Sequence, residues 1–157
     1  MSTTDDQLAV MQIATSMFTT ADAKDFDAYE ALLADEIVAD FGGVNDDAAG
    51  SITAKQMRAS AENVVGPVAI TQHMISSLTA TVDGDEAEVH FYEEALHVHP
   101  ALGDAPDRNT WVIYGKGTHR LRRIDGTWKI VAAALTPTHS TGNDNLLAEV
   151  GELVKRG

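Results

Sequence analysis

The sequence contains no cysteine. This absence excludes disulfide bonds, thiolate nucleophiles and metal sites built on cysteine. Basic residues are also scarce, since 11 Lys and Arg stand against 24 Asp and Glu and give a formal net charge of -13. A surface of that sign repels phosphate groups, so we expect neither a nucleic-acid partner nor a membrane partner.

Long apolar runs are absent too. No stretch approaches the roughly 20 apolar residues that span a bilayer. Residues 1–6 have neither the basic region nor the apolar segment of a signal peptide, and we expect a cytoplasmic protein. What is present is a chain of 157 residues, 44% of them hydrophobic, with no internal repeat or linker. We therefore predict a single domain over residues 1–157 with its own buried core.

The first part of the chain carries helix signals. Thr4 and Gln7 fit a capping box, in which both side chains satisfy free backbone N–H groups. A stripe of residues then follows at spacings of three and four, which predicts one face of an amphipathic helix: Leu8, Met11, Thr15 and Phe18. The same spacing then reaches Asp22, which places a carboxylate on the apolar face of this helix.

Further helices and a short strand follow. Asp25 opens a helical segment that runs through residues 26–33, and residues 37–41 are typical of a short strand. Thr53 and Gln56 form a second capping box, which begins a helix of about ten residues. Residues 143–155 predict a short helix at the end of the chain.

The second half is typical of β structure. Residues 70–82 and 86–99 are long strand candidates joined by Asp83-Gly84-Asp85, and residues 109–124 and 127–138 are joined by Asp125-Gly126. Strands this long usually bend, and we expect bends at Gly115 and Gly117. Helices first and hairpins afterwards predict an α+β fold with an antiparallel sheet.

Five short segments stand out by their order and spacing: residues 23–27, residues 37–43, Thr71-Gln72-His73, residues 124–130, and Gly142-Asn143. Together they resemble the SnoaL-like, scytalone dehydratase-like branch of the nuclear transport factor 2-like superfamily, over roughly residues 8–147. The resemblance implies a cone-shaped α+β barrel, in which N-terminal helices pack on a strongly curved antiparallel sheet and enclose a mostly apolar pocket.

The resemblance also implies candidate catalytic residues. Scytalone dehydratase carries an Asp at the end of its first long helix, a His in a Thr-Gln-His segment and a second His on the next strand. These correspond here to Asp22, His73 and His97. Two tyrosines that hold a water molecule in that enzyme correspond to Ala21 and Phe41, which argues against its own substrate.

These residues suit acid–base chemistry without a cofactor or a metal. Elimination of water or halide beside an acidic C–H needs a base that works near neutral pH, which imidazole provides. We predict His73 as general base, Asp22 as the partner that fixes its tautomer, and His97 as acid or leaving-group donor. The predicted activity is that of a lyase or dehydratase acting on a small hydrophobic carbonyl or polycyclic substrate.

Other interpretations stay open. An isomerase or polyketide cyclase would use the same residues, because it also begins by abstracting a proton beside a carbonyl. In a non-catalytic binding domain, Asp22 would be a capping residue and the histidines would be structural. Strand alternation places His73 with Thr71 and Ile75 on the more polar face, so a buried base requires a bulge or a polar pocket.

A metal site is a further alternative. His97 and His99 fall on one face of a strand, and His73 would supply a third nitrogen. No ligand motif of specific spacing supports this alternative, and we predict a site without metal.

The predicted partner is a small hydrophobic or aromatic ligand. We expect its pocket to be lined by Phe18, Phe41, Met74, Phe91, Trp111 and Tyr114, although such residues also serve as simple core. The resemblance implies a homodimer or homotrimer formed through the open face of the sheet.

Overall fold

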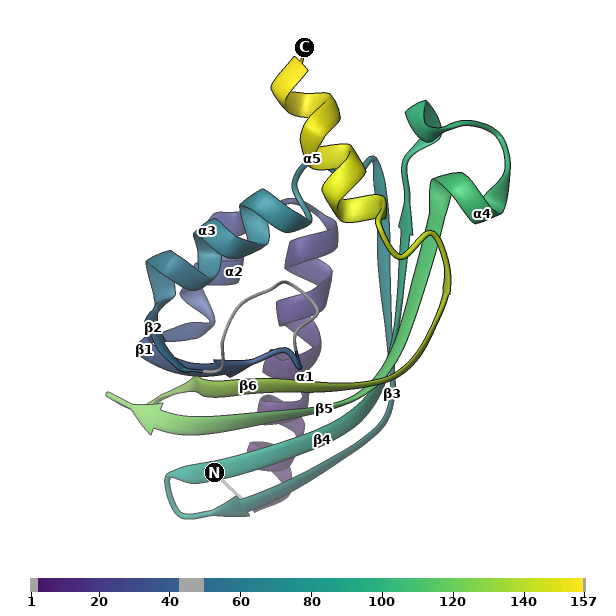
Figure 1. The fold of residues 1–157 in the computed structure, drawn as a ribbon. Helices are drawn as coiled ribbons and strands as arrows, with labels where there is room; N and C mark the ends of the chain where they lie inside the picture. The colour runs from purple at the N-terminus through teal and green to yellow at the C-terminus, as the bar shows by residue number, and fades with distance from the viewer. Residues whose placement is uncertain (1–2, 43–49, 157) are drawn as a thin grey trace.

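The fold places several helices on one side of a curved sheet (Figure 1). The computed structural model describes residues 3–42 and 50–156. The first elements in chain order are α1 (Thr3–Asp22), α2 (Phe26–Ala31), β1 (Leu33–Asp40), β2 (Gly50–Thr53) and α3 (Ala54–Val64). The remaining ones are β3 (Ile70–Asp83), β4 (Glu86–Val98), η1 (Pro100–Leu102), α4 (Pro106–Asn109), β5 (Thr110–Ile124), β6 (Thr127–Gly142) and α5 (Leu146–Arg156).

The sheet has six strands in the order β2-β1-β6-β5-β4-β3. The two predicted hairpins, β3–β4 and β5–β6, are confirmed, and so is the α+β class with a curved sheet. The prediction of a purely antiparallel sheet is wrong for one pair, since β1 and β6 run parallel. Turn signals in a sequence report on strands that are joined directly, and β1 and β6 lie far apart in the chain.

Helix α1 is rotated relative to the predicted stripe. Its buried apolar face consists of Val10, Ala14, Met17 and Ala21, whereas Leu8 is 57% exposed. The predicted capping box at its start is wrong, because the helix already begins at Thr3 and the Gln7 amide donates a hydrogen bond to the Ala80 carbonyl of β3. Two of the four residues on the buried apolar face, Ala14 and Ala21, are small, which favours close packing of α1 on the sheet.

The other helix caps follow the prediction. The Asp25 carboxylate accepts a hydrogen bond from the backbone N–H of Ala28, and Thr53 and Gln56 form a complete capping box. Short elements without strong signals, β2 and α4, were not predicted. In the part of the chain that the structure describes, no helix is both long and apolar enough to cross a membrane.

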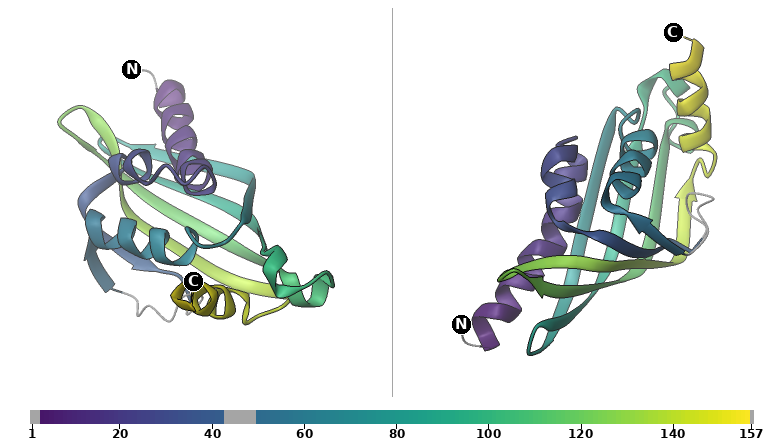
Figure 2. Two further views of the ribbon diagram at one scale, coloured as in Figure 1. Left: turned by 90° about the horizontal axis from the view of Figure 1, so that it is seen from above. Right: turned by 90° about the vertical axis from the view of Figure 1, so that its left-hand side faces the viewer.

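The core is divided into two clusters. The larger one joins α1, α2 and α3 to the inner face of the sheet, and includes Val10, Ile37, Leu121 and Ile130. A smaller cluster lies where α5 packs against the sheet, and its buried residues are Val68, Ala95, Trp111, Ile113, Leu146 and Val150. Figure 2 shows α1, α2 and α3 on the same side of the sheet, with α5 near one end.

A β-bulge in β3 decides which of its side chains face the helices. The pairing with β4 shifts between Ser76 and Thr79, and Ser77 has a φ of 54°. Before the bulge the partly buried residues include His73 and Ile75, and after it they are Leu78, Ala80 and Val82. The requirement for a bulge is thus met: His73 faces inward even though the apolar residues beyond it have the opposite parity.

Two glycines allow a close approach between strands. The register of β5 against β6 shifts between Tyr114 and Gly115, in agreement with a predicted bend. A Cβ atom on Gly117 would lie 2.0 Å from Cε2 of Phe91, its partner across the β4–β5 ladder. The Phe91 ring therefore occupies the space that a side chain at position 117 would need.

We expect Gly117→Ala to lower the free energy of unfolding by about 1–3 kcal/mol, because the added methyl group overpacks against Phe91. Urea denaturation measures this change. Gly151→Ala is the matched control: no atom lies within 4 Å of the added Cβ, and the residue is within α5, so stability stays equal or rises. Equal effects of the two changes would contradict the close approach.

Ser77 provides a second test, because its left-handed backbone disfavours a branched side chain. Ser77→Val should lower stability by more than about 1 kcal/mol, whereas Ser77→Gly should be neutral or stabilising. Ser76→Val, at the exposed neighbouring position, should cost little. Denaturation curves in which Ser77→Val and Ser77→Gly are alike would rule out this bulge geometry.

Candidate active site

A pocket lies between the helices and the inner face of the sheet. The space it encloses, together with its open mouth, is about 850 Å³. Most of its wall is apolar. The side chains of the wall that can take part in acid–base chemistry are Tyr29, His73, Glu93, His97 and His119.

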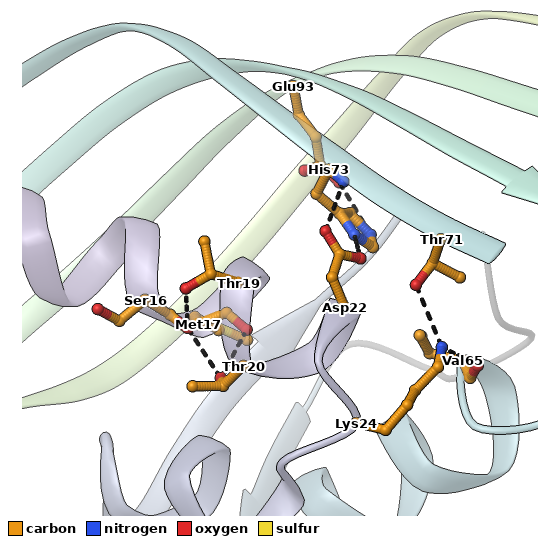
Figure 3. Close-up of polar contacts among 10 residues, drawn as sticks. All are labelled: Ser16, Met17, Thr19, Thr20, Asp22, Lys24, Val65, Thr71, His73 and Glu93. Carbon is orange, nitrogen blue, oxygen red and sulfur yellow. Dashed lines mark hydrogen bonds and ion pairs between the residues drawn. The ribbon is translucent and has the colours of Figure 1, made fainter.

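Asp22 and His73 are joined by two hydrogen bonds at the edge of this pocket (Figure 3). Asp22 is the last residue of α1, and its Oδ1 lies 2.7 Å from Nδ1 of His73 on β3. Its other oxygen, Oδ2, accepts the backbone N–H of His73 at 2.8 Å. One carboxylate therefore fixes both the ring and the main chain of the same residue.

This arrangement defines the tautomer of His73. An ionised carboxylate only accepts hydrogen bonds, so Nδ1 carries the proton and Nε2 of the neutral ring is left as an acceptor. Burial alone would raise the pKa of Asp22, but the hydrogen bonds from the His73 side chain and backbone hold it below its ordinary value. Asp22 is therefore charged at neutral pH, and the His73 side chain is only 10% exposed.

Further hydrogen bonds close to this contact involve Lys24 and Thr71. Lys24 has a φ of 58°, which turns the chain sharply after α1. Its Nζ donates to the Val65 carbonyl at 2.6 Å and to Oγ1 of Thr71 at 3.1 Å (Figure 3). Burial lowers the pKa of Lys24, while the charge of Asp22 opposes that change. These bonds tie the end of α1 to the end of α3 and to the start of β3.

Glu93 is a pocket residue that the sequence analysis missed. It lies on β4 between Phe91 and Ala95, on the buried face of the strand, and its side chain is 7% exposed. Its Oε1 is 3.9 Å from Nε2 of His73. Burial raises the pKa of Glu93, and the charge of Asp22 adds to this rise while His73 opposes it. One indication of this site was visible in the sequence: Glu93 is a charged residue at an alternating position that otherwise carries the apolar residues Ala87, Val89, Phe91 and Ala95.

His97 lies beside His73, with the two ring centroids 5.7 Å apart. Its ring also packs on Trp111, and its buried Nδ1 has no hydrogen-bond partner within residues 3–42 and 50–156. Burial lowers the pKa of His97 to about 4, and its proximity to His73 adds to this shift. At neutral pH His97 is therefore an uncharged ring, which suits a hydrogen-bonding role better than that of a proton-donating imidazolium.

His119 was not a candidate in the sequence analysis, yet it also belongs to the pocket wall. Its ring stacks on Phe18 at a centroid distance of 5.6 Å and meets Phe91 edge-on. Burial lowers the pKa of His119 to about 4, so this ring is neutral as well. The residue extends the aromatic part of the wall.

Four of the six predicted lining residues, Phe18, Phe41, Phe91 and Trp111, are in the wall of the pocket. The prediction is wrong for Met74 and Tyr114, because strand alternation turns them to the opposite face of the sheet. Met74 follows the inward His73 and is 43% exposed. Tyr114 follows the buried Ile113, and its ring stacks on His139.

The three-histidine metal site is not formed. Across the ranges 3–42 and 50–156, no three His, Asp or Glu side chains are grouped so that they could hold a metal ion. His97 is within β4 and faces the pocket, whereas His99 lies beyond the end of the strand, where its N–H donates to the Asn109 carbonyl.

Known structures share this fold. The Kfla4162 protein from Kribbella flavida superposes with a TM-score of 0.82 at 24% identity, over 90% of this chain and 95% of that one. A proposed scytalone dehydratase from Novosphingobium aromaticivorans gives 0.70 at 18% identity, over 85% and 84% of the two chains. A type 2 hexachlorocyclohexane dehydrochlorinase gives 0.71 at 17% identity, over 85% and 86%. Identities this low establish the fold alone.

The family assignment comes from a comparison of the sequence. No curated protein matches the chain. The model of the SnoaL-like domain, however, matches residues 2–134, and this range includes α1 with Asp22, β3 with His73 and β4 with Glu93 and His97. The chain therefore belongs to the SnoaL-like domain family.

Proposed function

We propose that this protein is a cofactor-independent acid–base enzyme that catalyses an elimination on a small, hydrophobic carbonyl or polycyclic substrate. The observation that carries the proposal is the double hydrogen bond between Asp22 and His73. It leaves Nε2 of His73 as an acceptor in a largely apolar pocket. An oriented imidazole of this kind is suited to abstract a proton from carbon.

The proton is taken by Nε2 of His73 from a carbon next to the carbonyl of the substrate. The imidazolium that forms is stabilised by the charge of Asp22, which already holds Nδ1–H at 2.7 Å. The aromatic wall, with Phe18 and Phe91, excludes water and strengthens this interaction. The electron pair of the broken C–H bond then forms a carbon–carbon double bond as a group leaves the neighbouring carbon.

Two structural relatives support the reaction class by their names. One is a proposed scytalone dehydratase and the other a hexachlorocyclohexane dehydrochlorinase, and both names describe the removal of a small group with a proton. The contact between Asp22 and His73 gives this chain the equipment for the first step of such a reaction. An isomerase or cyclase would share that step and differ in its product.

The first test is the His73→Ala variant, offered β-hydroxy ketones and fused-ring ketones in D₂O. We expect the wild type to exchange the α-proton and eliminate water, and the variant to lose about 10²–10⁴-fold of both rates, because the base is gone. NMR of the substrate measures exchange and product together. His90→Ala is the control, since His90 is 55% exposed.

Either of two results would overturn the proposal. In the first, His73→Ala exchanges as fast as the wild type. In the second, the wild type binds these ketones but neither exchanges their α-protons nor forms product, and the domain is then a binding module. Exchange without elimination would instead identify an isomerase or a cyclase.

A separate variant, Asp22→Asn, tests the orientation of the ring. The amide oxygen can still accept the His73 backbone N–H, but the NH₂ group then donates to Nδ1 and drives the ring proton to Nε2. We expect a loss of about 10²–10⁴-fold in exchange rate, as for other dyads in which the wrong tautomer is imposed. ¹⁵N NMR of the His73 ring reads the tautomer directly. An unchanged tautomer with normal activity would contradict the role of Asp22.

A further inference from the structure

We propose that Glu93 is the proton donor of this site and that it protonates the group that leaves the substrate. This inference rests on the proposed elimination and deepens it. It assigns the donor to a residue outside the Asp22, His73 and His97 set.

The position of Glu93 carries the inference. The residue is part of the pocket wall, and its Oε1 lies 3.9 Å from Nε2 of His73, which is beyond hydrogen-bond distance. Figure 3 shows Glu93 beside His73, on the neighbouring strand. Two groups at this spacing can reach adjacent atoms of one small molecule. In a β-hydroxy ketone, these atoms are the hydrogen on the α-carbon and the oxygen on the β-carbon.

The surroundings of Glu93 favour its protonated form. The side chain is almost entirely buried, its strand neighbours on the same face are Phe91 and Ala95, and the charged Asp22 lies across His73. Burial is the largest influence and raises the pKa of Glu93; His73 opposes this rise and the charge of Asp22 adds to it. A carboxyl group that keeps its proton is a hydrogen-bond donor as well as an acid.

The other polar residues of the wall are weaker acids in this role. His97 and His119 are neutral rings, since burial lowers the pKa of each to about 4. Tyr29 is also buried, and burial raises its pKa above the ordinary value for a phenol. Among the described residues of the wall, Glu93 therefore combines an available proton with proximity to the base.

The reaction balances with these two groups alone. Nε2 of His73 takes the α-proton, and the C–H electron pair becomes the new carbon–carbon double bond. The C–O bond to the β-carbon breaks, and its electron pair stays on the oxygen, which takes the proton of Glu93 and leaves as water. His73 is then an imidazolium and Glu93 a carboxylate, and both groups are restored when the water that has formed relays a proton from Nε2 to Oε1 before it departs.

The test compares two leaving groups in the wild type and in Glu93→Gln. Hydroxide is a poor leaving group, and its loss is strongly accelerated when an acid protonates it, whereas 4-nitrophenoxide leaves readily without an acid. We expect Glu93→Gln to lower kcat/KM for the β-hydroxy ketone by about 10²–10⁴-fold. For the same ketone with a β-(4-nitrophenoxy) group, the loss should stay below about 10-fold, which is the low end for the loss of a single polar contact. Glu94→Gln is the matched control, because this neighbour has the opposite strand parity.

The outcomes separate the two proposals. If the wild type neither exchanges the α-proton nor eliminates water, or if both rates are indifferent to His73, the elimination itself is refuted and this inference falls with it. If exchange depends on His73 but Glu93→Gln loses equally on both ketones, or on neither, Glu93 is not the proton donor although the elimination stands.

A measurement on the unchanged protein guards against a variant that fails to fold. Infrared spectroscopy at neutral pH should show the carbonyl stretch of a buried, protonated carboxyl group, which moves in protein labelled with ¹³C at glutamate carboxyls. The band should change when a β-hydroxy ketone binds. A spectrum without a protonated glutamate at neutral pH would overturn the inference.

Discussion

The bond between Asp22 and His73 is the interaction on which the rest of the site depends. It joins the last residue of α1 to the main chain and the ring of a residue on β3, two elements that are separated by β1, β2 and α3 in the chain. The same carboxylate thus closes the helical layer onto the sheet and selects one tautomer of the imidazole. Under the proposed function, stability and chemistry share this single contact, so a change at Asp22 affects both.

Neighbouring groups in the pocket differ in charge state because hydrogen bonding and burial act on them in opposite directions. Asp22 receives hydrogen bonds from His73 and stays ionised, whereas burial favours the neutral acid of Glu93 and the neutral rings of His97 and His119. Two carboxyl groups flank one imidazole, and each has a different environment. In the proposed reaction, Asp22 is therefore the group that orients the base, and Glu93 is the group that gives up a proton.

The sequence predicted much of this arrangement, with failures that have physical causes. Asp22 and His73 were identified from the sequence because the segments around them resemble those of a known family. Glu93 was missed because a charge within an apolar stripe has no motif around it. Met74 was assigned to the pocket although strand alternation prevents it from sharing a face with His73, and only the contact with Asp22 decides which of the two points inward. The stripe on α1 was displaced because its sheet-facing residues include Ala14 and Ala21, which are weak hydrophobic signals.

Helix α5 follows the part of the chain that matches the family model, which ends at residue 134. Leu146 and Val150 of this helix are buried in the smaller core cluster, and Leu147 contributes to the wall of the pocket. The groups to which the proposed function assigns proton transfer all come from earlier in the chain. Substitution at Leu147 can therefore change this part of the pocket wall without altering Asp22, His73 or Glu93.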